Sequence, residues 1–220
     1  MKHILCLFLL GSSSLLLAQS TTDSRSWIGI ETAVELSRLI DIDLGIQHRT
    51  KDNLAALDEY FFENTINYKL NDQFNFGIGT RYIKHNDTKG GQQGIENRWR
   101  FQAELSFKQK WERLIFKSKL QYQTLRDAEN AMDVLTNYIR LKNSVEFKIN
   151  HWKYDPTLSV EPFVYSNHPF LSGIKQWRFG IDTDFNVFND QKIKVGYYYA
   201  TNVQDTFNRH IFILLYKLKL

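Results

Sequence analysis

The feature that most constrains the fold is an alternation of apolar and polar residues that recurs along almost the whole chain. Ile40, Ile42, Leu44 and Ile46, for example, are separated by Asp41, Asp43 and Gly45. A period of two is the spacing of a β-strand, because successive side chains point to opposite faces. Eleven runs of this kind occur, at 28–36, 40–47, 62–70, 74–82, 98–107, 114–122, 139–149, 158–164, 177–187, 193–199 and 211–220. The sequence therefore predicts an all-β protein whose strands each have one apolar face.

The polar connections between these runs alternate in length. Short connections are expected at 37–39, 71–73, 108–112, 150–156 and 189–191, and longer ones at 51–57, 85–94, 124–136, 166–175 and 201–208. Asn and Asp in several short connections suit tight hairpin turns. Hairpins that follow one another along the chain predict an up-and-down antiparallel barrel.

Three observations indicate that the apolar face points outward to lipid. A lumen formed by about 8 to 12 strands has no room for four or five large apolar side chains from every strand. Many runs reach about ten residues, the length that a tilted strand needs to cross a bilayer. The tryptophans lie near strand ends, where amphipathic rings form a girdle at headgroup depth; the expected girdle residues are Trp99, Trp111, Trp152 and Trp177.

These observations predict a transmembrane antiparallel up-and-down β-barrel of 10 or 12 strands. The short turns are expected in the periplasm and the longer loops outside the cell. Eleven runs conflict with the even number that a bacterial barrel normally has. Either the first run, which also has apolar residues at helical spacing, is not a wall strand, or one strand has no clear alternation.

The N-terminus has the layout of a secretory signal. A short basic start is followed by an apolar segment, and Ala18 precedes the expected cleavage point. We therefore expect a signal peptide at 1–18, a barrel at 19–220, and a location in the outer membrane of a Gram-negative bacterium. Cys6 lies too early in the signal to accept a lipid anchor, and the mature chain has no other cysteine for a disulfide or a thiolate metal site. The pI near 9.0 reflects a weak, scattered positive charge that gives no reason to expect nucleic acid.

The polar face carries charges of both signs. Acidic residues are concentrated in the first runs and basic residues in the middle ones, so barrel closure should bring an acidic wall near a basic one. The expected lumen network comprises Glu31, Glu35, Asp41, Asp43, Arg81, Arg98, Arg100, Lys117, Lys119, Arg140, Lys142, Asp182 and Asp184. Such a network either fills and stiffens the lumen, because buried charges need partners, or lines a narrow small-solute pore.

The last run differs from the others. Ile211, Ile213 and Leu215 are apolar on the face that is polar elsewhere. The lumen beside this strand is therefore expected to be apolar and packed against Tyr198 of the neighbouring strand.

No catalytic residue, cofactor site or metal site is predicted. Ser166 and His168 form the one nucleophile-and-base pair worth noting, and they lie in a loop. The motifs of serine hydrolases and zinc peptidases are absent from the sequence. Two alternatives stay open beside a structural or pore-forming barrel: a barrel enzyme that acts on phospholipid or lipopolysaccharide, and a soluble periplasmic barrel that binds a ligand.

Several stretches together resemble a family of Bacteroidetes outer-membrane proteins known as domain of unknown function 2490. They are the signal ending in Ala-Gln, Trp27, the acidic strand that ends in Arg49, Tyr60-Phe61-Phe62, the Gly77-x-Gly79-x-Arg81-Tyr82 motif, Arg98-Trp99-Arg100-Phe101 and the closing strand. The resemblance covers nearly all of the mature chain and implies an outer-membrane barrel without an assigned activity. The expected partners are outer-membrane lipids, lipopolysaccharide and, during biogenesis, the barrel-assembly machinery, and the barrel is expected to be a monomer.

Overall fold

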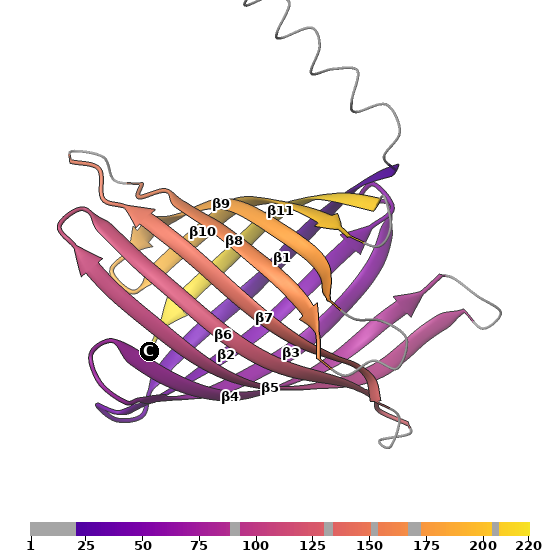
Figure 1. The fold of residues 1–220 in the computed structure, drawn as a ribbon, viewed down its shortest axis with the longest axis horizontal. Coiled ribbons are helices and arrows are strands. Elements are labelled where there is room, and N and C mark those ends of the chain that lie inside the picture. The colour runs from indigo at the N-terminus through magenta and orange to yellow at the C-terminus, as the bar shows by residue number, and fades with distance from the viewer. Residues whose placement is uncertain (1–20, 89–92, 130–133, 151–153, 167–172, 204–206) are drawn as a thin grey trace, which may run out of the picture.

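Eleven strands of the described chain close into one barrel, tilted relative to its axis (Figure 1). The computed structural model describes residues 21–88, 93–129, 134–150, 154–166, 173–203 and 207–220. The strands are β1 (Thr21–Glu35), β2 (Ile40–Lys51), β3 (Ala56–Lys69), β4 (Phe74–Asp87), β5 (Gly94–Trp111), β6 (Leu114–Asp127), β7 (Val134–Phe147), β8 (Thr157–Tyr165), β9 (Ile174–Phe188), β10 (Gln191–Asn202) and β11 (Phe207–Lys219). None of the described residues forms a helix long and apolar enough to cross a membrane.

Strands that follow one another in the sequence pair antiparallel around the barrel, as expected for an up-and-down topology. The closing pair is different, because β1 and β11 run parallel, with Trp27 opposite Ile213 and Glu31 opposite Lys217. The expected count of 10 or 12 strands is therefore wrong for the described chain. The run at 28–36 belongs to the wall strand β1. With an odd number of up-and-down strands, the first and last point in the same direction and can only close in parallel.

The two ends of the barrel carry different connections. The short-turn rim has those at 36–39, 70–73, 112–113, 148–156 and 189–190, and the long-loop rim has those at 52–55, 88–93, 128–133, 166–173 and 203–206. The expected strict alternation of length is wrong at three places. The expected long connection at 201–208 spans only 203–206, the same length as those at 36–39 and 70–73. The 148–156 connection is long, and the expected long loop at 51–57 is a tight turn, because β2–β3 pairing continues to Lys51 and Ala56. Asp52, Asn53 and Leu54 close that turn with positive φ angles of 55°, 55° and 70°.

The barrel is apolar outside and polar inside. Large side chains such as Ile30 and Ile46 are 55% and 60% exposed on the outer face. The buried positions of the described chain are mainly polar: Asp23, Gln47, Lys51, Thr65, Arg81, Arg100, Gln102, Glu104, Gln121, Gln123, Asn137, Ser144, Glu161, Gln176 and Asp182. A soluble barrel buries its apolar face instead, so this arrangement is inverted relative to one.

One sector of the lumen is apolar, as the last run predicts. Ile211, Ile213 and Leu215 of β11 are buried and pack with Tyr198 and Ala200 of β10, and Trp27 of β1 lies against this cluster. Gly180 on β9 leaves the space that the Tyr198 ring occupies: a Cβ atom there would lie 2.4 Å from two ring carbons. The expectation of a packed apolar lumen beside the last strand is confirmed.

Candidate functional site in the barrel lumen

The lumen contains an extended set of ion pairs and hydrogen bonds. Twelve of the thirteen charged residues expected to point inward line the cavities described below, and Arg98 lies on the same face of β5 as Arg100. Those that form ion pairs among the described residues do so with partners outside the predicted set: Glu35 with Lys219, Asp41 with Lys69, Arg81 and Arg100 with Glu63, Arg98 with Glu96, Lys117 with Glu146, Lys119 with Glu104, Arg140 with Glu161, Asp182 with Lys194, and Asp184 with Lys217. Glu31, Asp43 and Lys142 form hydrogen bonds, with Gln47, Asn67 and the Tyr198 hydroxyl.

Three aromatic rings and four guanidinium groups meet in the half of the lumen nearer the long-loop rim. We call this the arginine–aromatic layer; it comprises Trp27 of β1, Arg49 of β2, Phe61 of β3, Arg81 of β4, Arg140 of β7, Phe163 of β8 and Arg178 of β9. Cationic groups within about 6 Å of a ring centre are attracted to the ring face, most strongly where water is excluded. The layer therefore satisfies its cations partly with rings.

Contacts within the layer run both along the wall and across the lumen. The Arg49 guanidinium carbon lies 4.0 Å from the Trp27 ring centre and 4.7 Å from that of Phe61, and Arg81 lies 3.5 Å from Phe61. Arg178 lies 4.9 Å from the Trp27 ring centre and 4.6 Å from that of Phe163. Because β9 and β1 are not neighbours in the wall, the Arg178–Trp27 contact crosses the lumen. These contacts link β1, β2, β3 and β4 with β8 and β9 through side chains that point into the lumen.

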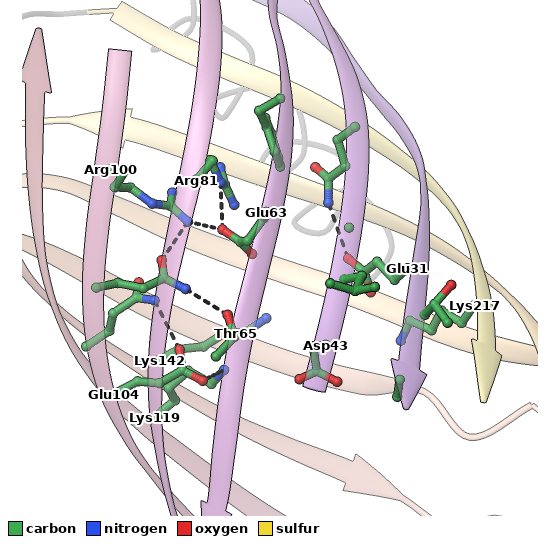
Figure 2. A pocket seen from close by; sticks show the side chains of 18 of the residues that line it. Glu31, Asp43, Glu63, Thr65, Arg81, Arg100, Glu104, Lys119, Lys142 and Lys217 are labelled. Carbon is green, nitrogen blue, oxygen red and sulfur yellow. Dashed lines mark hydrogen bonds and ion pairs between the residues drawn. The ribbon is translucent and has the colours of Figure 1, made fainter. Parts of the chain in front are cut away.

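Three glutamates pair with the arginines of the layer, and one of them, Glu59, pairs with Arg49 at 2.8 Å. Glu161 of β8, with only 5% of its side chain exposed, accepts hydrogen bonds from Arg140 at 3.0 and 2.7 Å and from Arg178 at 3.3 Å. Glu63 of β3 accepts from Arg81 at 2.6 Å and also from Arg100 of β5 (Figure 2). Glu161 and Glu63 therefore each pair with two guanidinium groups. Removing either carboxylate would leave two buried positive charges without their counter-ion.

Below the layer, toward the short-turn rim, the lumen is hollow. A central cavity of about 490 Å³ has Phe61, Arg81, Arg100, Arg140 and Glu161 among its lining residues. Figure 2 labels Arg81 and Arg100 among them. A cavity of about 280 Å³ lies beside β1–β6 and shares lining residues with it. A third cavity, of about 540 Å³, is lined mainly by β5–β7 and β9–β11 and shares Lys142 and Lys217 with the central one.

The smaller cavity, of about 280 Å³, and the larger one, of about 540 Å³, differ in the charge of their linings. The smaller is lined by Glu35, Asp41, Asp43, Glu104, Lys69, Lys119 and Lys219 among its charged residues. The larger is lined by Lys108, Lys110, Lys117, Lys142, Lys148, Lys192, Lys194, Lys217, Glu146, Asp155, Asp182 and Asp184. The smaller cavity is thus nearly balanced, with four carboxylates and three lysines, whereas the larger one has four more lysines than carboxylates. Lys148, just beyond the end of β7, donates to Asp155 at 2.6 Å and pairs with Glu146 at 2.7 Å, and these hydrogen bonds raise the pKa of its ammonium group.

Comparison with protein families gives a match over most of the chain. The family model described as "Protein of unknown function (DUF2490)" matches residues 24–210. The chain belongs to this family. No curated protein and no solved structure matches the chain. The residues matched to the DUF2490 family run from β1 into β11 and contain the whole arginine–aromatic layer.

The tryptophans predicted to form a girdle can be placed in three cases. Trp99 and Trp177 lie on the outer face toward the long-loop rim, where Trp99 packs against Tyr82 with ring centres 4.9 Å apart. Trp111, expected in a turn, is the last residue of β5 at the short-turn rim and is 56% exposed. Trp152 lies outside the described residues.

No group of three or more His, Cys, Asp or Glu side chains is arranged to hold a metal ion within the described ranges. His168 of the noted Ser166–His168 pair lies outside the described residues.

The sequence reasoning missed the rings inside the lumen. Because Phe61 and Phe62 are adjacent phenylalanines, the residue types alone do not show which of the two side chains points into the lumen. The flanking glutamates carry the missing signal, because Glu59 and Glu63 have the same parity as Phe61 and all three point into the lumen.

Proposed function

We propose that this chain is an integral outer-membrane β-barrel protein whose lumen is closed by the arginine–aromatic layer. In this proposal residues 1–18 direct export from the cytoplasm of a Gram-negative, Bacteroidetes-type bacterium and are removed. Outer-membrane lipid and lipopolysaccharide then surround the barrel, which the barrel-assembly machinery inserts as a monomer. The short-turn rim faces the periplasm and the long-loop rim faces the outside.

The observation that carries this proposal is the inverted distribution of polarity. Ile28, Ile46, Ile66 and Ile78 are 49%, 60%, 54% and 58% exposed on four successive strands of one continuous outer face. In water that face would be an apolar patch far larger than monomeric soluble proteins normally expose. Lipid removes this cost, and a closed barrel has no unpaired strand edge, which a membrane barrel requires.

The layer favours a structural or tightly gated role over an open pore. An open porin has a continuous water-filled channel along its axis. Here the Arg178–Trp27 contact joins β9 to β1 inside the lumen, past β10 and β11. Solutes would therefore reach the layer from the periplasmic side and stop there.

Heat-modifiable migration tests the membrane part of the proposal. The chain without residues 1–18 is folded into detergent micelles and run on SDS gels with and without boiling. A folded outer-membrane barrel resists SDS and migrates differently until it is heated. A chain that folds to a monodisperse, SDS-sensitive protein in buffer without detergent would instead support the soluble ligand-binding barrel.

Conductance across a planar bilayer tests the closed lumen. The unchanged protein is expected to give no porin-like steps. Phe61→Ala removes a ring held between Arg49 and Arg81 and should produce measurable steps, whereas Phe62→Ala, the same change one residue away on the outer face, should not. Large steps from the unchanged protein would show that the layer does not close the lumen.

A further inference from the structure

The cavity of about 540 Å³ near the short-turn rim has a surplus of positive charge. Its lining contains eight lysines and four carboxylates, so it carries an excess of four positive charges at neutral pH. The whole chain has the same formal net charge of +4. We call this cavity the lysine vestibule.

The four carboxylates of the vestibule already form ion pairs with four of its lysines. Glu146 pairs with Lys117 and Lys148, Asp155 with Lys148, Asp182 with Lys194, and Asp184 with Lys217. Lys142 donates to the Tyr198 hydroxyl at 3.2 Å. Lys108, Lys110 and Lys192 form no ion pair within the described part of the chain, and all three are exposed. Three ammonium groups are therefore available to a ligand.

The strand register places like charges opposite one another. Lys108 on β5 faces Lys117 on β6, and Lys119 on β6 faces Lys142 on β7. Like charges directly opposite on neighbouring strands destabilise a sheet. Nearby carboxylates relieve Lys117 and Lys119, which pair with Glu146 and Glu104. An anion bound between Lys108 and its neighbours would reduce the repulsion that remains between these lysines.

The chemistry of the lining indicates the class of ligand. Lysine binds phosphate as a point charge on a flexible stem, and no arginine lines the vestibule. Its volume lies within the range of small-molecule sites. Ile115 is the one apolar side chain in the lining that the structure describes, so an acyl chain has no surface to contact.

We propose that the lysine vestibule binds a small soluble polyanion that carries two or more phosphate groups. The ligand enters and leaves through the short-turn rim, because the arginine–aromatic layer closes the lumen above it. This site is a separate proposal from the membrane role, because it lies in the lumen whether lipid or water surrounds the barrel. A negative binding result can therefore be distinguished from a failure of the membrane proposal, which the SDS-gel assay tests separately.

Calorimetric titration of the detergent-folded protein with inorganic tripolyphosphate, in about 0.15 M salt, tests the site. The unchanged protein should bind one tripolyphosphate. Combined Lys108→Gln, Lys110→Gln and Lys192→Gln changes should weaken binding about a hundredfold, at roughly fivefold for each ammonium lost near an anion in water. The control carries Arg38→Gln, Lys84→Gln and Arg113→Gln, which remove the same total charge outside the vestibule, and should bind within about twofold of the unchanged protein.

Two results would overturn the proposal. One is the absence of saturable binding to the unchanged protein when the SDS-gel assay shows it to be folded. The other is an equal loss of affinity in the vestibule variant and the control, which would show attraction to net charge alone. Lys192→Gln alone, at the exposed start of β10, serves if the combined variant does not fold, and its expected loss is about fivefold.

Discussion

Glu161 is the residue whose neutralisation should most disturb the lumen. It accepts three hydrogen bonds from Arg140 and Arg178, and its side chain is 5% exposed. In Glu161→Gln the side chain keeps its shape and one carbonyl acceptor but loses its charge. Two guanidinium groups, each less than a fifth exposed, would then share no carboxylate at this position.

The size of the effect follows from the partners that remain. Removing one partner of a buried ion pair typically costs about 3–5 kcal/mol, because the other charge is left uncompensated. Arg140 retains hydrogen bonds to Gln121 and Gln123, and Arg178 retains its ring contacts, so the lower end applies. We expect Glu161→Gln to lower the free energy of unfolding by about 3 kcal/mol.

Urea unfolding of the detergent-folded protein, followed by tryptophan fluorescence, measures this loss. The matched control is Glu35→Gln, because Glu35 is 44% exposed and lies 3.6 Å from Lys219, which is 67% exposed. Exposed pairs contribute at most about 1 kcal/mol, so the control should change little. If the two variants lose the same stability within about 0.5 kcal/mol, the assignment of Glu161 as the shared counter-ion of the layer is wrong.

Two further predictions concern packing and pH. Gly180→Ala should destabilise the barrel by about 1–3 kcal/mol in the same assay, since its methyl group would collide with the Tyr198 ring, whereas Gly45→Ala meets its nearest atom at 3.9 Å and should not; equal losses would contradict the clash. Because the folded-state pKa of Lys148 is raised, its stabilising effect is fully present below its unfolded pKa and is lost as pH rises through the folded value. Lys148→Gln should therefore lower the urea midpoint at pH 8 but much less at pH 12, and a loss that does not depend on pH would contradict this.

The alternation of residues predicted the wall of this barrel well, because each strand obeys a local rule. Side-chain parity depends only on the pleat, so the charges on the polar face were placed on the luminal side. The same rule predicted the packing of Ile211 and Ile213 against Tyr198, since those residues break the polar parity of the last strand.

The arrangement inside the lumen could not be predicted in the same way. Which side chains meet across the bore depends on the tilt and stagger of the closed barrel, and these are properties of all the strands together. Arg178 and Trp27 are far apart in the sequence and belong to strands that do not pair, so no local pattern brings them together. The predicted strand number was wrong for a related reason. The expectation of an even number was given more weight than the alternation in β1, which is as clear as that of its neighbours.

The parallel seam between β1 and β11 has a consequence for the order of folding. Every other strand pair joins neighbours in sequence and can form as a local hairpin, but the seam joins Thr21–Glu35 to Phe207–Lys219 and must wait until the intervening strands exist. Closing such a distant contact costs chain entropy before any hydrogen bond offsets it, and parallel pairing is slightly weaker per residue. The β1–β11 seam should therefore be the last strand pair to form during assembly and the first to separate when the barrel is pulled apart.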